Sequence, residues 1–412
     1  MIAGVPGPEA VAALPMVGLA DWLDGHSARM VDDLAALVRI ESPSGDLAAL
    51  DACLGAIMNW LEGLLGPADT AERHSDAEFG TVVVLDYAAT GGAGFVSDTR
   101  PVVLLAHYDT VWGVGTLADR PWRESRGRAQ APGGFDMKGG LVQAVWGLAA
   151  ARRLGIALPT VRIVLTPDEE IGSPFSRPWI ERACASARAV LVAESAANGA
   201  LKTARSGVGL FRVQIDGIAS HSGLEPEAGA SAIDEAARVV LELHAASNPD
   251  ARTSVNAGII SGGTRPNVVA AHAVLDVDVR VTSAAEAARI DAVFESLVPR
   301  DPRARIAVSG GWNRPVMERT ASVAAMFALA AALGERLGEH LEEVAVGGAS
   351  DGNFAAALGL PVLDGLGAVG GGAHSADEWV DLSAMPVRAA LLAGIVATFA
   401  TPAGSDTEMK YG

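Results

Sequence analysis

Short apolar runs alternate with segments of helical period through the first half of the chain. Residues 81–87, 102–106, 161–166 and 189–193 are rich in β-branched and apolar side chains, as expected for strands buried on both faces. Between them, residues 140–153 place apolar side chains at helical spacing. Strands that alternate with helices predict an α/β domain with a mostly parallel sheet and flanking helices. Two earlier helices are expected at residues 19–37 and 50–64.

The middle of the chain follows a different pattern. Within residues 206–315 the segments come in the order strand, helix, strand, strand, helix, strand, which is a compact βαββαβ unit. After this unit the alternation of strands and helices resumes and closes with a helical segment at 387–399. We therefore expect one domain from residues 1–205 and 316–412, interrupted by a second domain at 206–315. Residues 403–412 are expected to be disordered.

Composition narrows the classes of function. The chain has 412 residues, of which 50% are hydrophobic, so it can bury a large core. Its two cysteines, Cys53 and Cys184, are too few for a disulfide framework or a thiolate metal site. A net charge of -18 opposes binding to nucleic acid or to anionic lipid. We expect a small-molecule substrate rather than a polyanion.

The N-terminal region does not have the pattern of a signal peptide. Its apolar stretch is interrupted by Pro15, has no basic residue before it, and runs into Asp21. The chain also lacks a run of about 18 uninterrupted apolar residues, so no membrane span is expected. These features predict a cytoplasmic protein.

Polar side chains collect where the predicted strands end. His107 and Asp109 follow the strand that ends at residue 106, Glu169 and Glu170 follow the one that ends at residue 166, and Glu194 follows residue 193. Open α/β sheets bind their ligands outside the carboxyl ends of the strands. We therefore expect these groups to share a site.

Two further candidates lie in glycine-rich segments. Asp136 precedes the helix at 140–153, and His374 follows a run of three glycines at 370–372. With the strand-end groups they complete a set of two imidazoles and three carboxylates, enough to hold two divalent cations. The five predicted ligands are His107, Asp136, Glu170, Glu194 and His374.

Two acidic residues beside these ligands suit supporting roles. Glu169, next to Glu170, is placed for a general base that deprotonates water. Asp109, two residues after His107, is placed to accept the second ring N–H and fix the tautomer. Each motif alone also has an explanation that involves no functional site, such as a solvated acidic loop or a local hydrogen bond. Their joint occurrence at strand ends favours a metal site.

Six short motifs span most of the chain. They are HYDTV at 107–111, GFDMKGG at 134–140, DEEIGS at 168–173, SHSG at 220–223, GGTRPNVV at 262–269 and GAHS at 372–375. In sequence and order these motifs resemble the M20 family of metallopeptidases, in its glutamate carboxypeptidase (carboxypeptidase G2-like) branch.

The resemblance implies a zinc-dependent exopeptidase-like catalytic domain with two metal ions, interrupted by a ferredoxin-like lid or dimerisation domain. It implies that Asp136 bridges the metals. His107 and Glu194 would then hold one ion, and Glu170 and His374 the other. The expected metal is Zn²⁺, although Co²⁺ or Mn²⁺ suits the same mixed nitrogen and oxygen ligands.

The resemblance also implies roles for the inserted domain. His221 would stabilise the tetrahedral oxyanion in the partner subunit's active site, so a homodimer is expected. Asn267 and Arg280 would grip the carboxylate of the substrate's C-terminal amino acid. A surface histidine, and a cross-strand ion pair of Arg280, are the structural alternatives.

The expected activity is hydrolysis of the amide bond to a C-terminal amino acid, most simply glutamate, in N-acyl, peptide or folate-like substrates. An aminoacylase, an acetylornithine-type deacetylase or a dipeptidase would use the same metal centre. A binding protein that has lost the reaction is a third hypothesis, which the complete ligand set opposes. The cation that would recognise a glutamate side chain remains open among Lys202, Arg205, Arg265 and Arg314.

Overall fold

The computed structural model describes residues 5–91 and 99–400, in two compact units. The first unit comprises Met1–Thr203, Arg319–Ala345 and Ser350–Gly412, and the second comprises Ala204–Glu318 and Val346–Ala349. The insertion expected at 206–315 thus lies inside the second unit. This unit also includes Val346–Ala349, which begins at the last residue of strand β13 (Glu343–Val346). The segment 403–412, expected to be disordered, lies outside the described residues.

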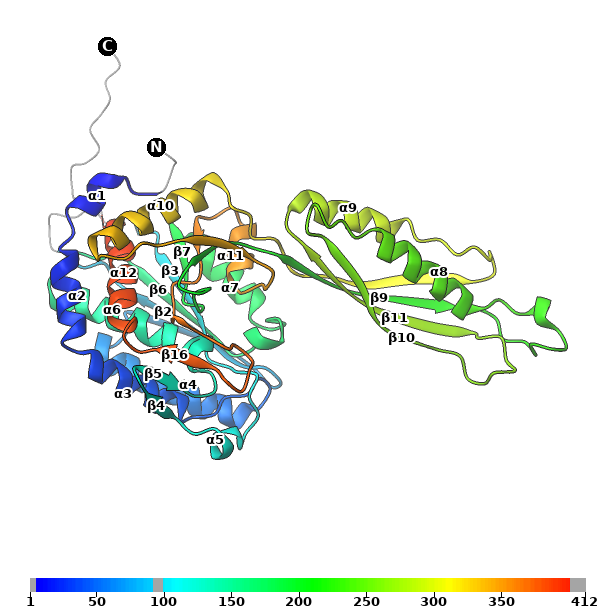
Figure 1. Ribbon diagram of the computed structural model, residues 1–412, viewed down its shortest axis with the longest axis horizontal. Helices are drawn as coiled ribbons and strands as arrows, with labels where there is room; N and C mark the ends of the chain where they lie inside the picture. Colours follow the sequence, from blue (N-terminus) through cyan, green and yellow to red (C-terminus); the bar gives the residue numbers. More distant parts are fainter. Residues whose placement is uncertain (1–4, 92–98, 401–412) are drawn as a thin grey trace, which may run out of the picture. The chain divides into compact units, whose positions relative to one another are not determined.

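A six-stranded sheet forms the centre of the first unit (Figure 1). Strands β6, β3, β7 and β14 run parallel to one another, whereas β2 is antiparallel to both β1 and β6. The α/β prediction with a mostly parallel sheet is therefore confirmed. The strand order across the sheet is β1 (Thr70–Asp76), β2 (Gly80–Tyr87), β6 (Val161–Thr166), β3 (Val102–His107), β7 (Ala189–Val192) and β14 (Val362–Leu363).

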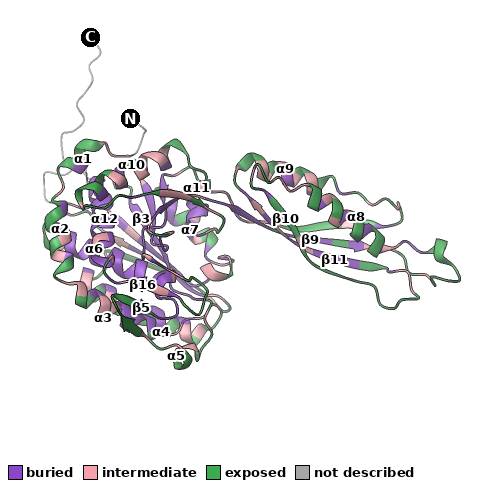
Figure 2. Ribbon diagram, in the orientation of Figure 1, coloured by how far each residue is buried: buried purple, intermediate pink, exposed green. Residues whose placement is uncertain are grey.

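Helix α6 (Gly139–Arg153) is buried over almost its whole length and packs against α12 (Met385–Thr398). A Cβ at Gly147 would lie 2.4 Å from the carbonyl oxygen of Ala389, so this glycine permits the close approach of the two helices. Figure 2 shows buried residues concentrated in these helices and in the sheet. The other helices of this unit are α1 (Pro8–Ala12), α2 (Met16–Asp24), α3 (Ser27–Val38), α4 (Leu47–Leu65), α5 (Thr116–Asp119), α7 (Arg177–Cys184), α10 (Ala321–Arg336) and α11 (Gly352–Ala357).

The structure differs from the expected elements in two respects. The helix expected at residues 19–37 is divided into α2 and α3 at Gly25 and His26, because the backbone leaves helical geometry at His26, where φ is -114° and ψ is 6°. Several strands were not predicted. β1 was missed because its residues are polar and mostly exposed, and the others because they are short and lack an unbroken or alternating apolar pattern. The others are β4 (Arg123–Ser125), β5 (Arg128–Gln130), β8 (Leu201–Arg205), β15 (Gly370–Gly371) and β16 (Trp379–Asp381).

Helix α4 is the one described helix long and apolar enough to span a membrane by length and composition alone. Its buried face includes Leu50, Leu54, Ile57 and Leu61, which belong to the main hydrophobic core. This face-dependent burial is that of a core helix rather than of a lipid-exposed one.

The second unit is a four-stranded antiparallel sheet with α8 and α9 on one face (Figure 1). Its elements follow the βαββαβ order, and the sheet order β10-β11-β9-β12 is that of a ferredoxin-like fold. Burial alternates along β9, so one face of the sheet is covered by the helices. The bounds are β9 (Gly207–Asp216), α8 (Ala232–Ala245), β10 (Ser254–Gly262), β11 (His272–Val281), α9 (Ala284–Glu295) and β12 (Arg305–Arg314).

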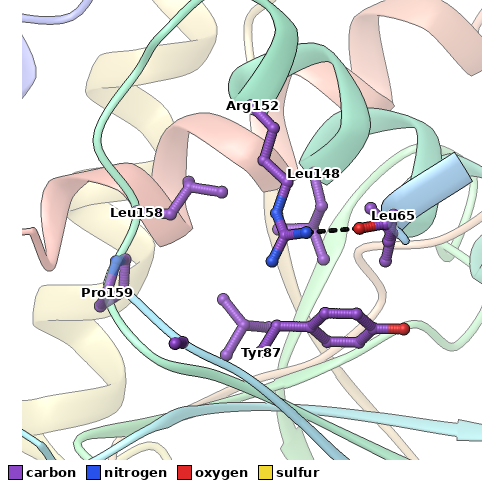
Figure 3. A pocket seen from close by; sticks show the side chains of 8 residues that line it. Leu65, Tyr87, Leu148, Arg152, Leu158 and Pro159 are labelled. Atoms are coloured by element: carbon purple, nitrogen blue, oxygen red, sulfur yellow. Dashed lines mark hydrogen bonds between the residues drawn. The ribbon is translucent and has the colours of Figure 1, made fainter. Parts of the chain in front are cut away.

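A small cavity of about 10 Å³ lies beside the C-terminal end of α6 (Figure 3). The guanidinium of Arg152 donates a 2.6 Å hydrogen bond to the carbonyl of Leu65 and lies 5.0 Å from the ring centre of Tyr87. A space of this size holds one water molecule at most, so it is not a substrate site.

Candidate metal centre

The register of three parallel strands brings the strand-end residues together. His107 is the last residue of β3 and pairs with Thr166, the last residue of β6. On the other side of β3, Leu105 pairs with Val192 of β7. Glu194 follows Val192 by two residues, just as His107 follows Leu105, so these two side chains emerge level with each other.

Five side chains converge at this edge of the sheet. Nε2 of His107 lies 3.4 Å from Oδ1 of Asp136 and 3.5 Å from Oε1 of Glu194. Nε2 of His374 lies 3.4 Å from Oδ2 of Asp136 and 2.9 Å from Oε2 of Glu170. The carboxylate of Asp136 therefore stands between the two imidazoles, with one oxygen directed to each.

The spacing of these atoms suits metal ions. Ligand atoms bound tetrahedrally at about 2.0–2.1 Å lie about 3.4 Å from one another. Two groups of three have possible ligand atoms within 4.8 Å of one another: His107 with Asp136 and Glu170, and His107 with Glu169 and Glu194. Nε2 of His107 and Oδ1 of Asp136 are buried and make no hydrogen bond. A divalent cation would satisfy both atoms.

The electrostatics of the cluster favour positive charge. Burial opposes protonation of His107, but the carboxylates of Asp109, Asp136 and Glu194 outweigh it and raise its pKa well above the usual range. Asp136 and Glu170 raise the pKa of His374 to about 10. Burial raises the pKa of Glu170. The protonated imidazoles thus supply positive charge that balances the carboxylates, as bound metal ions would.

The pKa of Asp136 moves in the opposite direction. Burial alone would raise it, but the imidazoles of His107 and His374 outweigh burial and lower it. The ammonium group of Lys202 adds to the lowering. Asp136 therefore stays ionised, as a bridging ligand must.

Asp109 connects two of the ligand-bearing segments. Nδ1 of His107 lies 3.1 Å from the carbonyl oxygen of Asp109 and 3.3 Å from its Oδ1. The same carboxylate accepts hydrogen bonds of 3.2 Å from the backbone N–H groups of Glu169 and Glu170, and one of 2.6 Å from Ser44. Asp109 lies where the predicted orienting role requires, and it also fixes the turn after β6.

The segment before α6 is held by a buried ammonium group, which the sequence reasoning did not single out. Nζ of Lys138 donates to the carbonyls of Ile40 at 2.7 Å and Leu37 at 3.3 Å, at the end of α3. Burial lowers the pKa of Lys138. A Cβ at Gly140 would lie 1.8 Å from the carbonyl oxygen of Ala193, so this glycine lets the segment approach β7. A lysine immediately before two glycines at a helix start was the available signal.

Two further aspartates support the turn that carries Glu169 and Glu170. Asp168 accepts hydrogen bonds from the backbone N–H groups of Phe175 and Ser176. Asp351 accepts from the hydroxyls of Thr166, at 3.0 Å, and Ser173, at 2.5 Å. Asp168 belongs to the acidic motif itself, but nothing in the sequence near Asp351 indicated its role, because the two segments meet only in the folded chain.

The remaining predicted residues lie in the second unit. Nδ1 of His221 accepts hydrogen bonds from the N–H groups of Gly223, at 3.1 Å, and Leu224, at 3.2 Å, which leaves the ring proton on Nε2. The backbone N–H of Ser222 donates to the carbonyl of Asn267, so the loops of His221 and Asn267 are adjacent.

Arg280 pairs with Asp278, two residues earlier on the same strand, through two 2.9 Å hydrogen bonds. The cross-strand ion pair considered as the alternative is therefore wrong, because the observed pair is made along a single strand. Side chains two residues apart lie on the same face of a strand, which brings this carboxylate within reach.

Comparison with known proteins gives consistent matches over most of the chain. Residues 103–398 match Peptidase family M20/M25/M40, a range that includes all five predicted ligands. The chain is 30% identical over 377 residues to carboxypeptidase G2 of Pseudomonas sp. (strain RS-16), covering 89% of this chain and 88% of that protein. It is 32% identical over 198 residues to acetylornithine deacetylase of Myxococcus xanthus, covering 44% and 49% of the two chains.

Solved structures share the fold. Aminopeptidase PepT from Bacillus cereus has a TM-score of 0.72 at 20% identity, covering 90% of this chain and 98% of that one. YXEP of Bacillus subtilis, described as a dinuclear metal-binding peptidase, has a TM-score of 0.61 at 14% identity, covering 91% and 98%.

Proposed function

Because this chain belongs to peptidase family M20/M25/M40 and is a hydrolase of that family, we propose that it cleaves the amide bond to a C-terminal glutamate in N-acyl, peptide or folate-like substrates. The observation that carries this proposal is the convergence of His107, Asp136 and Glu194 on one side and His374 and Glu170 on the other. The same residues would hold two divalent cations, with zinc the best fit to the ligand set.

The cations held by these residues would polarise the scissile carbonyl and lower the pKa of the attacking water. A carboxylate oxygen of Glu169 lies within 4.8 Å of possible ligand atoms of His107 and Glu194, which supports its assignment as the general base. It would accept the proton of the attacking water and later deliver it to the leaving amine. Asp109 would hold the ring of His107 in one tautomer throughout.

The second unit would supply the groups that recognise the substrate. With Nδ1 of His221 accepting backbone N–H groups, Nε2–H is the donor that can meet a developing oxyanion. We propose that His221 acts on the active site of a partner subunit in a homodimer, as the family resemblance implies. Asn267 and Arg280 would bind the α-carboxylate of the substrate, and Arg280 would exchange Asp278 for it.

Preference for glutamate requires a cation that meets the side-chain carboxylate. Among the candidates, Lys202, Arg205 and Arg314 are all buried. Lys202 is the one whose charge also lowers the pKa of Asp136, so its ammonium group lies near the proposed metal centre. The similarity to carboxypeptidase G2 over 89% of this chain supports the wider class of reaction, which is removal of a C-terminal amino acid. We propose Lys202 as the group that selects an acidic side chain.

A substrate panel tests the proposal. N-acyl-glutamate, a folate analogue, and N-acyl derivatives of neutral amino acids and of ornithine should be compared on zinc-loaded enzyme. We expect kcat/KM for glutamate substrates to exceed that for neutral ones by about 10–100-fold, the value of one charge-assisted contact. Equal rates on neutral and acidic substrates would remove the glutamate assignment. Faster cleavage of acetylornithine would favour the deacetylase, which the match to acetylornithine deacetylase makes the second candidate.

A further inference from the structure

Glu378 is a buried carboxylate that the reaction scheme above does not use. It is 3% exposed and lies four residues after His374, immediately before β16. An ionised side chain at such a depth is costly unless hydrogen bonds satisfy it. Burial raises the pKa of Glu378, and hydrogen bonds from Gly133, Asp136 and Trp112 act against that rise.

Four N–H donors meet this one carboxylate. Oε1 accepts from the backbone N–H of Phe135 at 2.9 Å and of Asp136 at 3.1 Å. Oε2 accepts from the backbone N–H of Gly133 and from Nε1 of Trp112, both at 2.9 Å. All four acceptor positions of the carboxylate are therefore used.

The donors come from two different segments, each of which carries a proposed ligand. Residues 133–136 include Asp136 itself, and Trp112 follows His107 by five residues. Glu378 belongs to a third segment, the loop that carries His374. This loop is closed by the pairing of β15 with β16, in which Gly371 faces Trp379.

We propose that Glu378 is a positioning residue that fixes the three ligand-bearing segments relative to one another. The inference rests on the proposed metal centre and goes beyond it, because Glu378 is not one of the five proposed ligands. Its hydrogen bond to the N–H of Asp136 sets the backbone from which the bridging carboxylate reaches both imidazoles. Because Glu378 lies between His374 and β16, the same hydrogen bonds also hold the C-terminal end of the loop that carries His374.

The test is a metal titration of Glu378→Gln. The amide keeps one acceptor oxygen but turns an NH₂ group towards two N–H donors, so half of the contacts become repulsive. We expect zinc affinity to fall about 10–100-fold, measured by competition with a chelator, and kcat at saturating zinc to recover to within a few-fold. Asp377→Asn removes the same charge one position earlier and should leave zinc affinity within about twofold, as loss of surface charge alone does little.

Wild-type zinc affinity in a folded Glu378→Gln protein would overturn the inference, as would an equal loss in Asp377→Asn. Should Glu378→Gln fail to fold, Trp112→Phe removes one donor without burying a new polar group. A drop of about twofold to fivefold in zinc affinity then supports the inference, and no drop overturns it. If the wild-type protein bound no zinc, the proposed metal centre itself would be wrong. Failure of the inference about Glu378 leaves wild-type zinc binding intact, so the two results are distinguishable.

Discussion

The predicted functional residues of the two units differ in how firmly they are held. In the first unit, His107, Asp136 and Glu194 are largely enclosed, and backbone hydrogen bonds fix the segments that carry them. In the second unit, His221 lies in an exposed loop, and the partly exposed side chain of Arg280 pairs with the carboxylate of Asp278. The first arrangement is preorganised for ion binding, whereas the second suits groups that engage only when substrate is present.

The largest effect should come from Glu169→Gln, which keeps the shape of the side chain but removes its basicity. We expect kcat to fall about 10²–10⁴-fold, the usual contribution of a general base. Zinc content, measured by elemental analysis, should stay near that of the wild type. Turnover at the wild-type rate would refute the base assignment.

A matched change in the second unit is His221→Gln. Loss of an oxyanion donor should lower kcat by about 10²–10³-fold and leave zinc affinity unchanged, because no ligand is touched. If this variant lost zinc as readily as His107→Gln does, the assignment of metal binding to the first unit alone would be contradicted. Steady-state kinetics beside a chelator competition distinguish the two outcomes.

Zinc binding should strengthen as pH rises. The pKa of His374 in the metal-free fold is about 10, above its ordinary value of 6.5, so between these values the folded protein holds a proton that the metal must displace. The affinity should rise by up to about tenfold per pH unit for each displaced proton, and level off above pH 10. Calorimetry in buffers of different ionisation enthalpy measures the released protons. His221→Gln is the control and should release as many as the wild type.

Lys202→Met should narrow the difference between acidic and neutral substrates. We expect the glutamate preference in kcat/KM to fall about 10–100-fold, since one charged hydrogen bond is worth roughly 1.5–3 kcal/mol. Rates on a neutral N-acyl amino acid serve as the internal control. An unchanged preference would assign the side-chain carboxylate to another cation, such as Arg265.

The smallest effect is expected from Asp278→Asn, which frees Arg280 from its half-exposed ion pair. Such pairs contribute about 0–1 kcal/mol, so KM should fall by no more than about fivefold. Arg280→Lys, in contrast, should raise KM because an ammonium cannot bind a carboxylate in the same bidentate way. If neither variant alters KM, Arg280 does not contact the substrate.

The local pattern of hydrophobic and polar residues was sufficient to predict the fold class and the order of the main helices and strands. The apolar strands and the helix that becomes α6 were predictable because burial on both faces leaves an unbroken apolar run or a helical period in the sequence. The βαββαβ order of the second unit followed from the same rule. Polar edge strands such as β1, and the division of α2 from α3, were missed because their stability comes from partners elsewhere in the chain.

The candidate ligands could be named from the sequence because each follows a strand end or a glycine-rich turn. The sequence could not show that Asp136 stands between His107 and His374, since those contacts join segments far apart in the chain. Nor could it reveal Asp351 or Glu378 as supports. Residue type and spacing are local properties that sequence alone determined, whereas the position of a carboxylate relative to distant N–H donors is set only when the strands and loops pack together.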